Sequence, residues 1–178
     1  MEDHIGELNV PPPFWAFAWP GGQALARYIL DTSEEFKGRH VLDIGAGSGL
    51  SAIAAAQAGA ASVLAVDIDL FALEAIALNS VANNVFLATS SQDFASEELA
   101  DVDVILVGDL FYERPLAEKV MDFLLKSQPQ KIRMLIGDPE RTYFPKNKFC
   151  CITQYDVPVT RELEDSSLKK TAVWQFAC

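Results

Sequence analysis

Cysteine is scarce in this sequence, and the positions of its three cysteines exclude two common uses. Cys150 and Cys151 are adjacent and Cys178 stands alone, so they suit neither a disulfide framework nor a Cys-x-x-Cys metal pair. We therefore expect reduced thiols in a cytosol-like compartment, and no metal site.

Long apolar runs and a basic leader are also missing. No apolar stretch approaches the roughly 18 residues that indicate a membrane-spanning helix, and the first ten residues, MEDHIGELNV, are acidic where a signal or transit peptide is basic. These absences predict a soluble protein with no membrane partner. We expect a bacterial cytoplasmic location, and we favour the mitochondrial matrix less because a transit peptide is missing.

Positive charge is low, since 14 Lys and Arg against 25 Asp and Glu give a formal net charge of −11. Binding to nucleic acid depends on Lys and Arg that neutralise phosphates, so the composition predicts no nucleic-acid partner. Histidine is rarer still: His4 lies in the N-terminal arm and His40 begins a predicted strand. We therefore expect no histidine general base.

What the chain does contain is a regular alternation of strand and helix patterns over one domain, residues 1–178. Apolar and β-branched runs predict strands at 40–44, 62–68, 85–91, 102–109, 131–138, 149–157 and 171–178, and helical periodicity predicts helices at 21–36, 50–60, 69–84 and 114–127. Only the loop 160–170 joins the last two strands, so they should be antiparallel. The pattern predicts a doubly wound α/β fold, with its ligand at the carboxyl ends of the strands beside the first strand.

The strongest motif is VLDIGAGSG, in which Gly45, Gly47 and Gly49 directly follow the first strand. Glycines there let the backbone turn sharply and approach a ligand, while the next helix offers free N–H groups. A dinucleotide fingerprint requires a further glycine where Leu50 stands. Asp43 at the strand end also fits a nicotinamide site poorly and a cationic ligand well.

An acid ends the second strand as well. Asp67 lies where a ribose diol is held by two hydrogen bonds in folds of this topology, and Ile68 directly after it is expected to contact the cofactor as well. The set predicts a site for adenosine with a nearby positive charge and no phosphates, which describes S-adenosylmethionine (SAM). Asp93, after the third strand, could meet the adenine amino group, although Gln92 would serve as well and a plain turn is equally compatible.

These motifs resemble those of the class I SAM-dependent methyltransferases. The resemblance implies a mostly parallel, Rossmann-like sheet of seven strands in the order 3-2-1-4-5-7-6, with the last strand reversed. Three further pieces, PPPFWAFAWPGGQALARYILD, GDLFYE and LIGDPER, resemble the electron transfer flavoprotein (ETF) β-subunit lysine methyltransferases, from about Pro11 to Arg141. This narrower resemblance implies a protein-lysine N-methyltransferase whose protein partner and substrate is the ETF β subunit.

The segment GDLFYE supplies the expected catalytic pair, Asp109 and Tyr112, with Phe111 beside the substrate. A carboxylate there can hold an amine through its N–H groups and aim the lone pair at the methyl carbon. Asp109 alone favours the charged ammonium, whereas the sulfonium and a dry aromatic pocket oppose it. We therefore assign these residues to positioning, with water taking the proton.

The aromatic arm over residues 1–20 is expected to act as a lid. Trp19 is predicted to pack on the cofactor, and Trp15 and Phe14 to shape the lid or the lysine channel, because aromatic faces attract a sulfonium or an ammonium. The alternative is that these rings cap the edge of the core. Arg141, in a rim loop, either contacts the protein substrate or pairs with an acid.

Other functions compete with this prediction. A small-molecule or other-protein N-methyltransferase would use the same site, and a cofactor-binding regulator would keep the glycine loop without catalysis. The PPPF segment is similar to a motif of adenine methyltransferases, but it lies before the first strand, where it cannot meet the methyl group in the same way. A dehydrogenase is the weakest reading.

Overall fold

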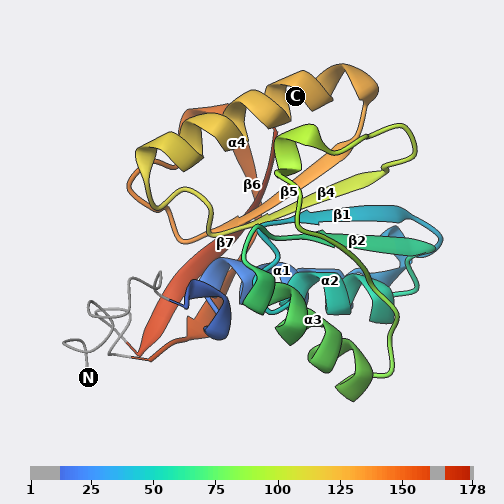
Figure 1. Cartoon of the computed structure of the whole chain (residues 1–178). Helices are drawn as coiled ribbons and strands as arrows, with labels where there is room; N and C mark the ends of the chain where they lie inside the picture. The colour runs from blue at the N-terminus through green and yellow to red at the C-terminus, as the bar shows by residue number, and fades with distance from the viewer. Residues whose placement is uncertain (1–12, 161–166, 177–178) are drawn as a thin grey trace, which may run out of the picture.

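The computed structural model describes residues 13–160 and 167–176 of the chain. Its centre is one seven-stranded sheet in the order β3-β2-β1-β4-β5-β7-β6 (Figure 1). The strands are β1 (His40–Ile44), β2 (Ser62–Val66), β3 (Ala88–Ser90), β4 (Val104–Gly108), β5 (Arg133–Asp138), β6 (Phe149–Pro158) and β7 (Leu168–Phe176). Because β7 pairs antiparallel with both β5 and β6, it is the reversed strand, and the expected fold class is confirmed.

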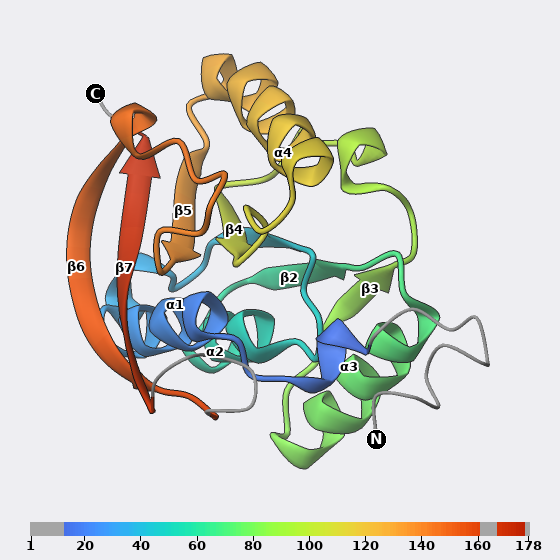
Figure 2. The same ribbon diagram turned by 90° about the vertical axis from the view of Figure 1, so that its left-hand side faces the viewer.

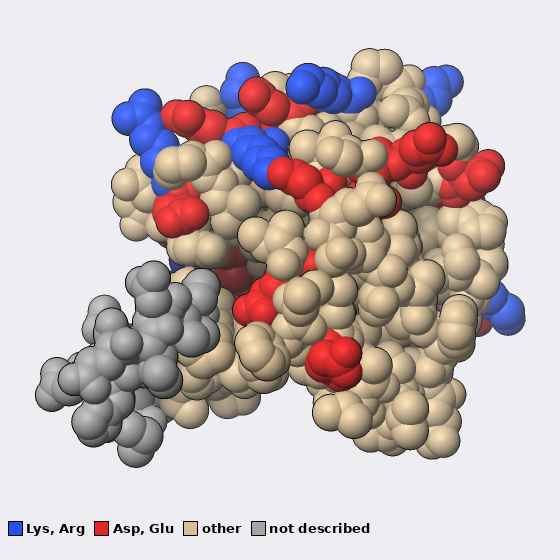
Figure 3. All heavy atoms as spheres, viewed as in Figure 1, with Lys and Arg blue, Asp and Glu red and all other residues tan. Residues whose placement is uncertain are grey.

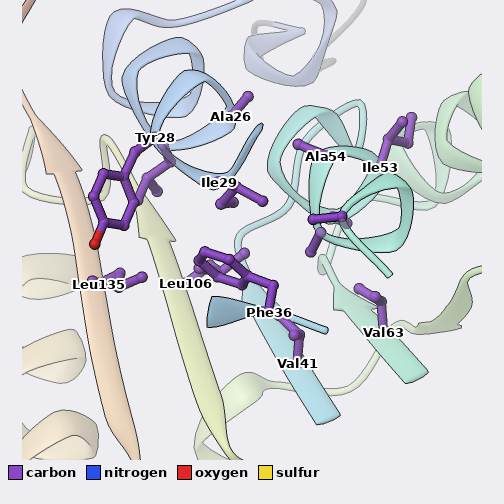
Figure 4. Close-up of a cluster of buried hydrophobic side chains, with 14 of the residues drawn as sticks. Ala26, Tyr28, Ile29, Phe36, Val41, Ile53, Ala54, Val63, Leu106 and Leu135 are labelled. Atoms are coloured by element: carbon purple, nitrogen blue, oxygen red, sulfur yellow. The ribbon is translucent and has the colours of Figure 1, made fainter. Parts of the chain in front are cut away.

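Helices cover both faces of the sheet. The helices α1 (Pro20–Asp31), α2 (Leu50–Gln57) and α3 (Leu70–Ala82) lie on one face, and α4 (Arg114–Ser127) lies on the other (Figure 1). Each face has its own apolar core. On the three-helix face the fully buried Phe36 lies among side chains of α1, α2 and the central strands (Figure 4). This two-sided burial explains why β4 reads as an almost continuous apolar run.

The first turn of α1 touches the end of β5 through backbone alone. A Cβ atom added to Gly21 would lie 2.1 Å from the carbonyl oxygen of Gly137, and one added to Gly137 would lie 2.1 Å from that of Gly21. No side chain fits at either position. The contact brings the backbone of α1 to the carboxyl ends of β4 and β5, where the candidate site lies.

The ends of several elements differ from the sequence prediction. The first helix stops at Asp31, and a short 3-10 helix, Ser33–Glu35, replaces its predicted end. β3 is shorter than predicted, because it pairs only with Leu64–Val66 of β2. β7 begins at Leu168, inside the predicted loop. Residues 177–178 of the last predicted strand, including Cys178, lie outside the described residues, as do 161–166 of that loop.

Candidate functional site

The glycine loop connects β1 to α2 and is held to the end of β2. Gly47 has a φ of 56°, in the left-handed region that side chains disfavour. Its backbone N–H donates a hydrogen bond to Oδ2 of Asp67 over 2.8 Å. The fold therefore brings the glycine motif and the second predicted acid into direct contact.

Asp67 organises two backbone segments with one carboxylate. Its Oδ1 accepts from the backbone N–H of Asp69 over 3.0 Å while Oδ2 accepts from Gly47. Burial raises the pKa of Asp67, and these two hydrogen bonds lower it. Each carboxylate oxygen has a second lone pair, so both can also accept from ligand hydroxyls.

Asp43 lies behind the loop with an unsatisfied oxygen. Its side chain is almost fully buried, and Oδ2 has no hydrogen-bond partner in the described part of the chain. The pKa of Asp43 is raised to about 7, mainly by burial and also by the charge of Asp67, and the backbone N–H of Ala52 opposes that rise. A buried acceptor without a partner is costly, so this position fits a cationic or hydrogen-bond-donating ligand.

Asp109 follows β4 in a strained turn and is held from two sides. Its φ of 56° is in the left-handed region, which costs free energy for a residue with a side chain. Oδ2 accepts from the backbone N–H of Gly22 over 3.1 Å. Oδ1 accepts from Nε and Nη2 of Arg141 over 3.1 and 3.0 Å. Burial raises the pKa of Asp109 to about 6, while Arg141 acts to lower it.

A second buried carboxyl, Asp138 at the end of β5, lies in the same cluster. Its Oδ1 accepts from the backbone N–H of Arg141 over 2.6 Å, and its Oδ2 has no partner among the described residues. The pKa of Asp138 is raised to about 7, mainly by burial and also by the charge of Asp109. Of the two roles left open for Arg141, the structure shows the pairing with an acid.

The described part of the arm lies across this site. The 3-10 helix η2 (Phe14–Ala16) runs beside α3 (Figure 2). The Cα of Trp15 is 3.6 Å from where a Cβ on Gly47 would stand. Trp19 donates from Nε1 to the carbonyl oxygen of Phe14, and the Arg141 guanidinium lies 5.5 Å from its ring centroid. Residues 1–12 of the predicted lid lie outside the described residues.

Tyr112 is half-exposed and its ring contacts the arm. Its ring centroid is 5.7 Å from that of Phe14. Burial raises the pKa of its phenol, and the charges of Glu113 and Asp67 raise it further. Tyr112 therefore lies close in space to Asp67 and the glycine loop that it holds, and three residues after Asp109 in the sequence.

Two predicted contact residues are placed differently. Phe111 is fully buried and packs edge-on against Phe144, 5.3 Å between centroids, so the structure gives it a core role in place of the expected substrate contact. Asp93 caps a short turn and pairs with Lys119, the plain-turn alternative. Ile68 is 76% exposed directly after Asp67, and its cofactor contact stays a prediction.

The order of the strands, the reversed β7 and the glycine loop tied to an acid after β2 define a class I SAM-dependent methyltransferase. The family model described as ribosomal protein L11 methyltransferase (PrmA) matches residues 23–111. The electron transfer flavoprotein beta subunit lysine methyltransferases of Danio rerio and Homo sapiens are each 38% identical to this chain, over 94% and 92% of it and 67% and 65% of their own lengths. The chain belongs to the family of ETF β-subunit lysine methyltransferases and spans about two thirds of these relatives.

Solved structures share the fold at low sequence identity. The ribosomal protein L11 methylase of Lactobacillus delbrueckii subsp. bulgaricus is 22% identical, with a TM-score of 0.54 over 87% of this chain and 79% of that one. The magnesium protoporphyrin IX methyltransferase of Synechocystis PCC 6803, solved with bound SAM, is 15% identical, with a TM-score of 0.60 over 88% of this chain and 79% of that one. Methyltransferases of different substrates thus share this sheet.

Proposed function

We propose that this chain transfers a methyl group from SAM to a lysine of the ETF β subunit. The printed names of the Danio rerio and human relatives support the reaction and the acceptor. The observation in the structure that carries the proposal is the buried Asp109 carboxylate, held beside Arg141 where β4 ends.

The residues around the glycine loop fit SAM. Asp43 offers an unsatisfied buried oxygen for a cationic group, and Asp67 offers free lone pairs for the ribose hydroxyls. Trp19 and Trp15 provide aromatic surface at the same place. When bound, SAM supplies an electrophilic methyl group on a positively charged sulfur.

Asp109 positions the acceptor nitrogen. Arg141 donates twice to Oδ1, and the backbone N–H groups of Gly22 and Gly21 stabilise the carboxylate from the first turn of α1, so Asp109 is held in one orientation toward the acceptor amine. Holding the nitrogen in a fixed direction removes much of the entropic barrier to transfer. A lysine ammonium has an ordinary pKa of about 10.4, so its deprotonation to the neutral amine at pH 7 costs about 4.6 kcal/mol.

Arg141 reduces the conflict that an isolated carboxylate would create. An unpaired Asp109 anion would stabilise the ammonium form, which has no lone pair for attack. The guanidinium balances that charge while it keeps the carboxylate ionised. The amine can then lose its proton to water, with Tyr112 and the arm limiting access to the site.

A transfer assay with labelled SAM tests the proposal. The purified chain is incubated in parallel with the ETF β subunit, ribosomal protein L11 and a small amine. We expect label on lysines of the ETF β subunit. Label on only one of the other two acceptors would contradict the proposed substrate and leave the methyltransferase class intact.

Two further predictions of the sequence stay predictions. The cytoplasmic location rests on the scarcity and spacing of cysteine, and the exclusion of nucleic acid rests on the acidic charge.

A further inference from the structure

The outer face of α3 is an exposed apolar surface. It consists of Leu70, Phe71, Leu78 and Val81, which recur at helical spacing, and it is flanked by Ile68 before the helix and Phe86 after it. Their exposed fractions are 67, 65, 72, 79, 76 and 88%, respectively. Isolated exposed apolar side chains are ordinary, but six large ones along one helix and its flanks indicate an interaction surface.

The sequence of α3 explains this face. The helix is apolar almost all round, although only the side that carries Ala72, Ile76 and Ser80 is buried against the rest of the domain. Helices of this composition are normally buried on all sides. No helix in the described ranges is long and apolar enough to cross a membrane. Within residues 13–160 and 167–176, no element therefore covers this outer face, although its composition suits burial.

The region of the chain around this surface is acidic. Residues 40–113 contain no lysine or arginine and eleven Asp or Glu. Glu74 is exposed on the outer face of α3 itself, and Asp69 caps its first turn. In Figure 3 the surface over α3 is mostly uncharged with some red, while most of the blue in that view lies over α4. A partner that presents apolar side chains together with lysines complements this face.

The outer face begins at the candidate site. Ile68 directly follows Asp67, which holds the glycine loop, and η2 of the arm contacts α3. From Phe71 to Val81 the helix extends the surface by about 15 Å. A polypeptide lying along α3 would thus reach the arm and the glycine loop without a break.

We infer that the outer face of α3 docks the protein substrate, through a segment of that protein that carries apolar side chains and lysines. This inference rests on the proposed function, because the docked segment belongs to the protein that presents the acceptor lysine. A second copy of this chain fits less well, since two such faces would bring like charges together.

Steady-state methylation of the ETF β subunit tests the docking surface. Leu78→Lys places a positive charge at its centre, and Leu78→Ser removes apolar area only. Leu125→Lys is the matched control, because Leu125 is a 46% exposed leucine on α4. We expect Leu78→Lys to raise the KM for the protein at least tenfold and Leu78→Ser to raise it less. The kcat and the affinity for S-adenosylhomocysteine should stay within twofold, and Leu125→Lys should resemble the wild type.

The outcomes separate the two claims. If the wild type methylates the ETF β subunit and Leu78→Lys leaves the KM unchanged, the docking inference is wrong and the proposed function stands. If the wild type binds S-adenosylhomocysteine but does not methylate that subunit, the proposed substrate falls and this docking inference falls with it. A wild-type dimer in sedimentation velocity that Leu78→Lys dissociates would assign the face to a second copy and overturn the inference.

Discussion

Asp109 illustrates how one carboxylate can be buried, ionised and held in one orientation. Burial pushes its pKa up and the Arg141 guanidinium opposes that rise, so that the pKa is raised to about 6. Arg141 holds Oδ1, and the backbone N–H groups of Gly21 and Gly22 stabilise the charge from the first turn of α1. A carboxylate that is held from two sides keeps one direction, which is what an orienting residue requires.

Replacing Asp109 by asparagine should reduce methyl transfer by about 100-fold or more, because a small misplacement of the reacting nitrogen has effects of that size. The affinity for S-adenosylhomocysteine should change by no more than a few-fold, since Asp109 does not belong to the glycine loop. Single-turnover kinetics and calorimetry measure the two effects. Unchanged turnover would remove Asp109 from the positioning role.

The pH dependence of kcat tests the role of Arg141. Ionised Asp109 is the active form, so the rate should rise with pH through the pKa of about 6. Arg141 lowers that pKa, so in Arg141→Gln the same rise should occur at higher pH. A profile that does not move would show that Arg141 has no influence on the ionisation that limits the rate.

At the scale of elements, the contact between α1 and β5 determines where the site forms. Gly21 and Gly137 let the two backbones touch, and the next residue, Gly22, then reaches Asp109. Gly137→Ala should lower the free energy of unfolding by about 2–3 kcal/mol, because the added Cβ overlaps backbone atoms that cannot move away.

Gly22→Ala is the control for this effect. A Cβ there has no atom nearer than 4.0 Å, so the free energy of unfolding should change by less than about 1 kcal/mol. Urea denaturation of both variants provides the comparison. Equal losses of stability would contradict the close contact.

The glycine loop permits a similar test of ligand binding. Gly47→Arg should abolish the binding of S-adenosylhomocysteine in calorimetry, because the new side chain enters the space beneath Trp15. Gly38→Arg is matched to it: Gly38 has a φ of 71°, and a Cβ there would meet no atom within 4 Å. Both variants carry similar backbone strain. If Gly38→Arg binds S-adenosylhomocysteine and Gly47→Arg does not, the loss of binding comes from the glycine loop and not from strain.

The sequence predicts most elements because their boundaries carry local signals. β1 ends where its glycines begin, and α4 has both predicted ends, Arg114 and Ser127. Asp69, the first residue of the predicted third helix, caps α3 by accepting a hydrogen bond from the backbone N–H of Phe71. β3 is too long in the prediction because its length depends on pairing with β2, which the local sequence does not contain.

The candidate site is less predictable for the same reason. Arg141 and Asp109 are 32 residues apart, and nothing local to either identifies the partner. Lys119 of α4 likewise reaches Asp93 from a distant segment. Asp109, two residues before Phe111, has a left-handed backbone, so the alternation of side chains along β4 does not extend to Phe111. The strand order itself came from family resemblance, whereas the alternation predicted only the doubly wound class.

For the whole molecule, three buried carboxyls connect the site to stability. The pKa values of Asp43 and Asp138 are raised to about 7 and that of Asp109 to about 6, mainly by burial. Between about pH 4, the unfolded value, and about pH 7, the folded chain therefore binds more protons than the unfolded chain. Their contribution to stability is present below about pH 4 and is lost as the pH rises to about 7.

Asp43→Asn should therefore gain stability relative to the wild type at pH 8 and not at pH 4, because asparagine stays neutral. Urea denaturation at the two pH values measures the difference. Asp156→Asn, at an exposed position of β6, is the control and should show no such pH-dependent gain. A gain of equal size at both pH values would contradict the burial of an ionised Asp43.

The central claim is that the glycine loop and its acids bind SAM next to a carboxylate that aims a lysine of the ETF β subunit. Intact-mass measurement of that subunit after incubation with SAM and the chain tests it most directly. The account predicts mass steps of one methyl group with the wild type, and with Asp109→Asn the same steps at a rate lower by about 100-fold or more. An unmodified subunit after incubation with a wild-type chain that binds S-adenosylhomocysteine would contradict it.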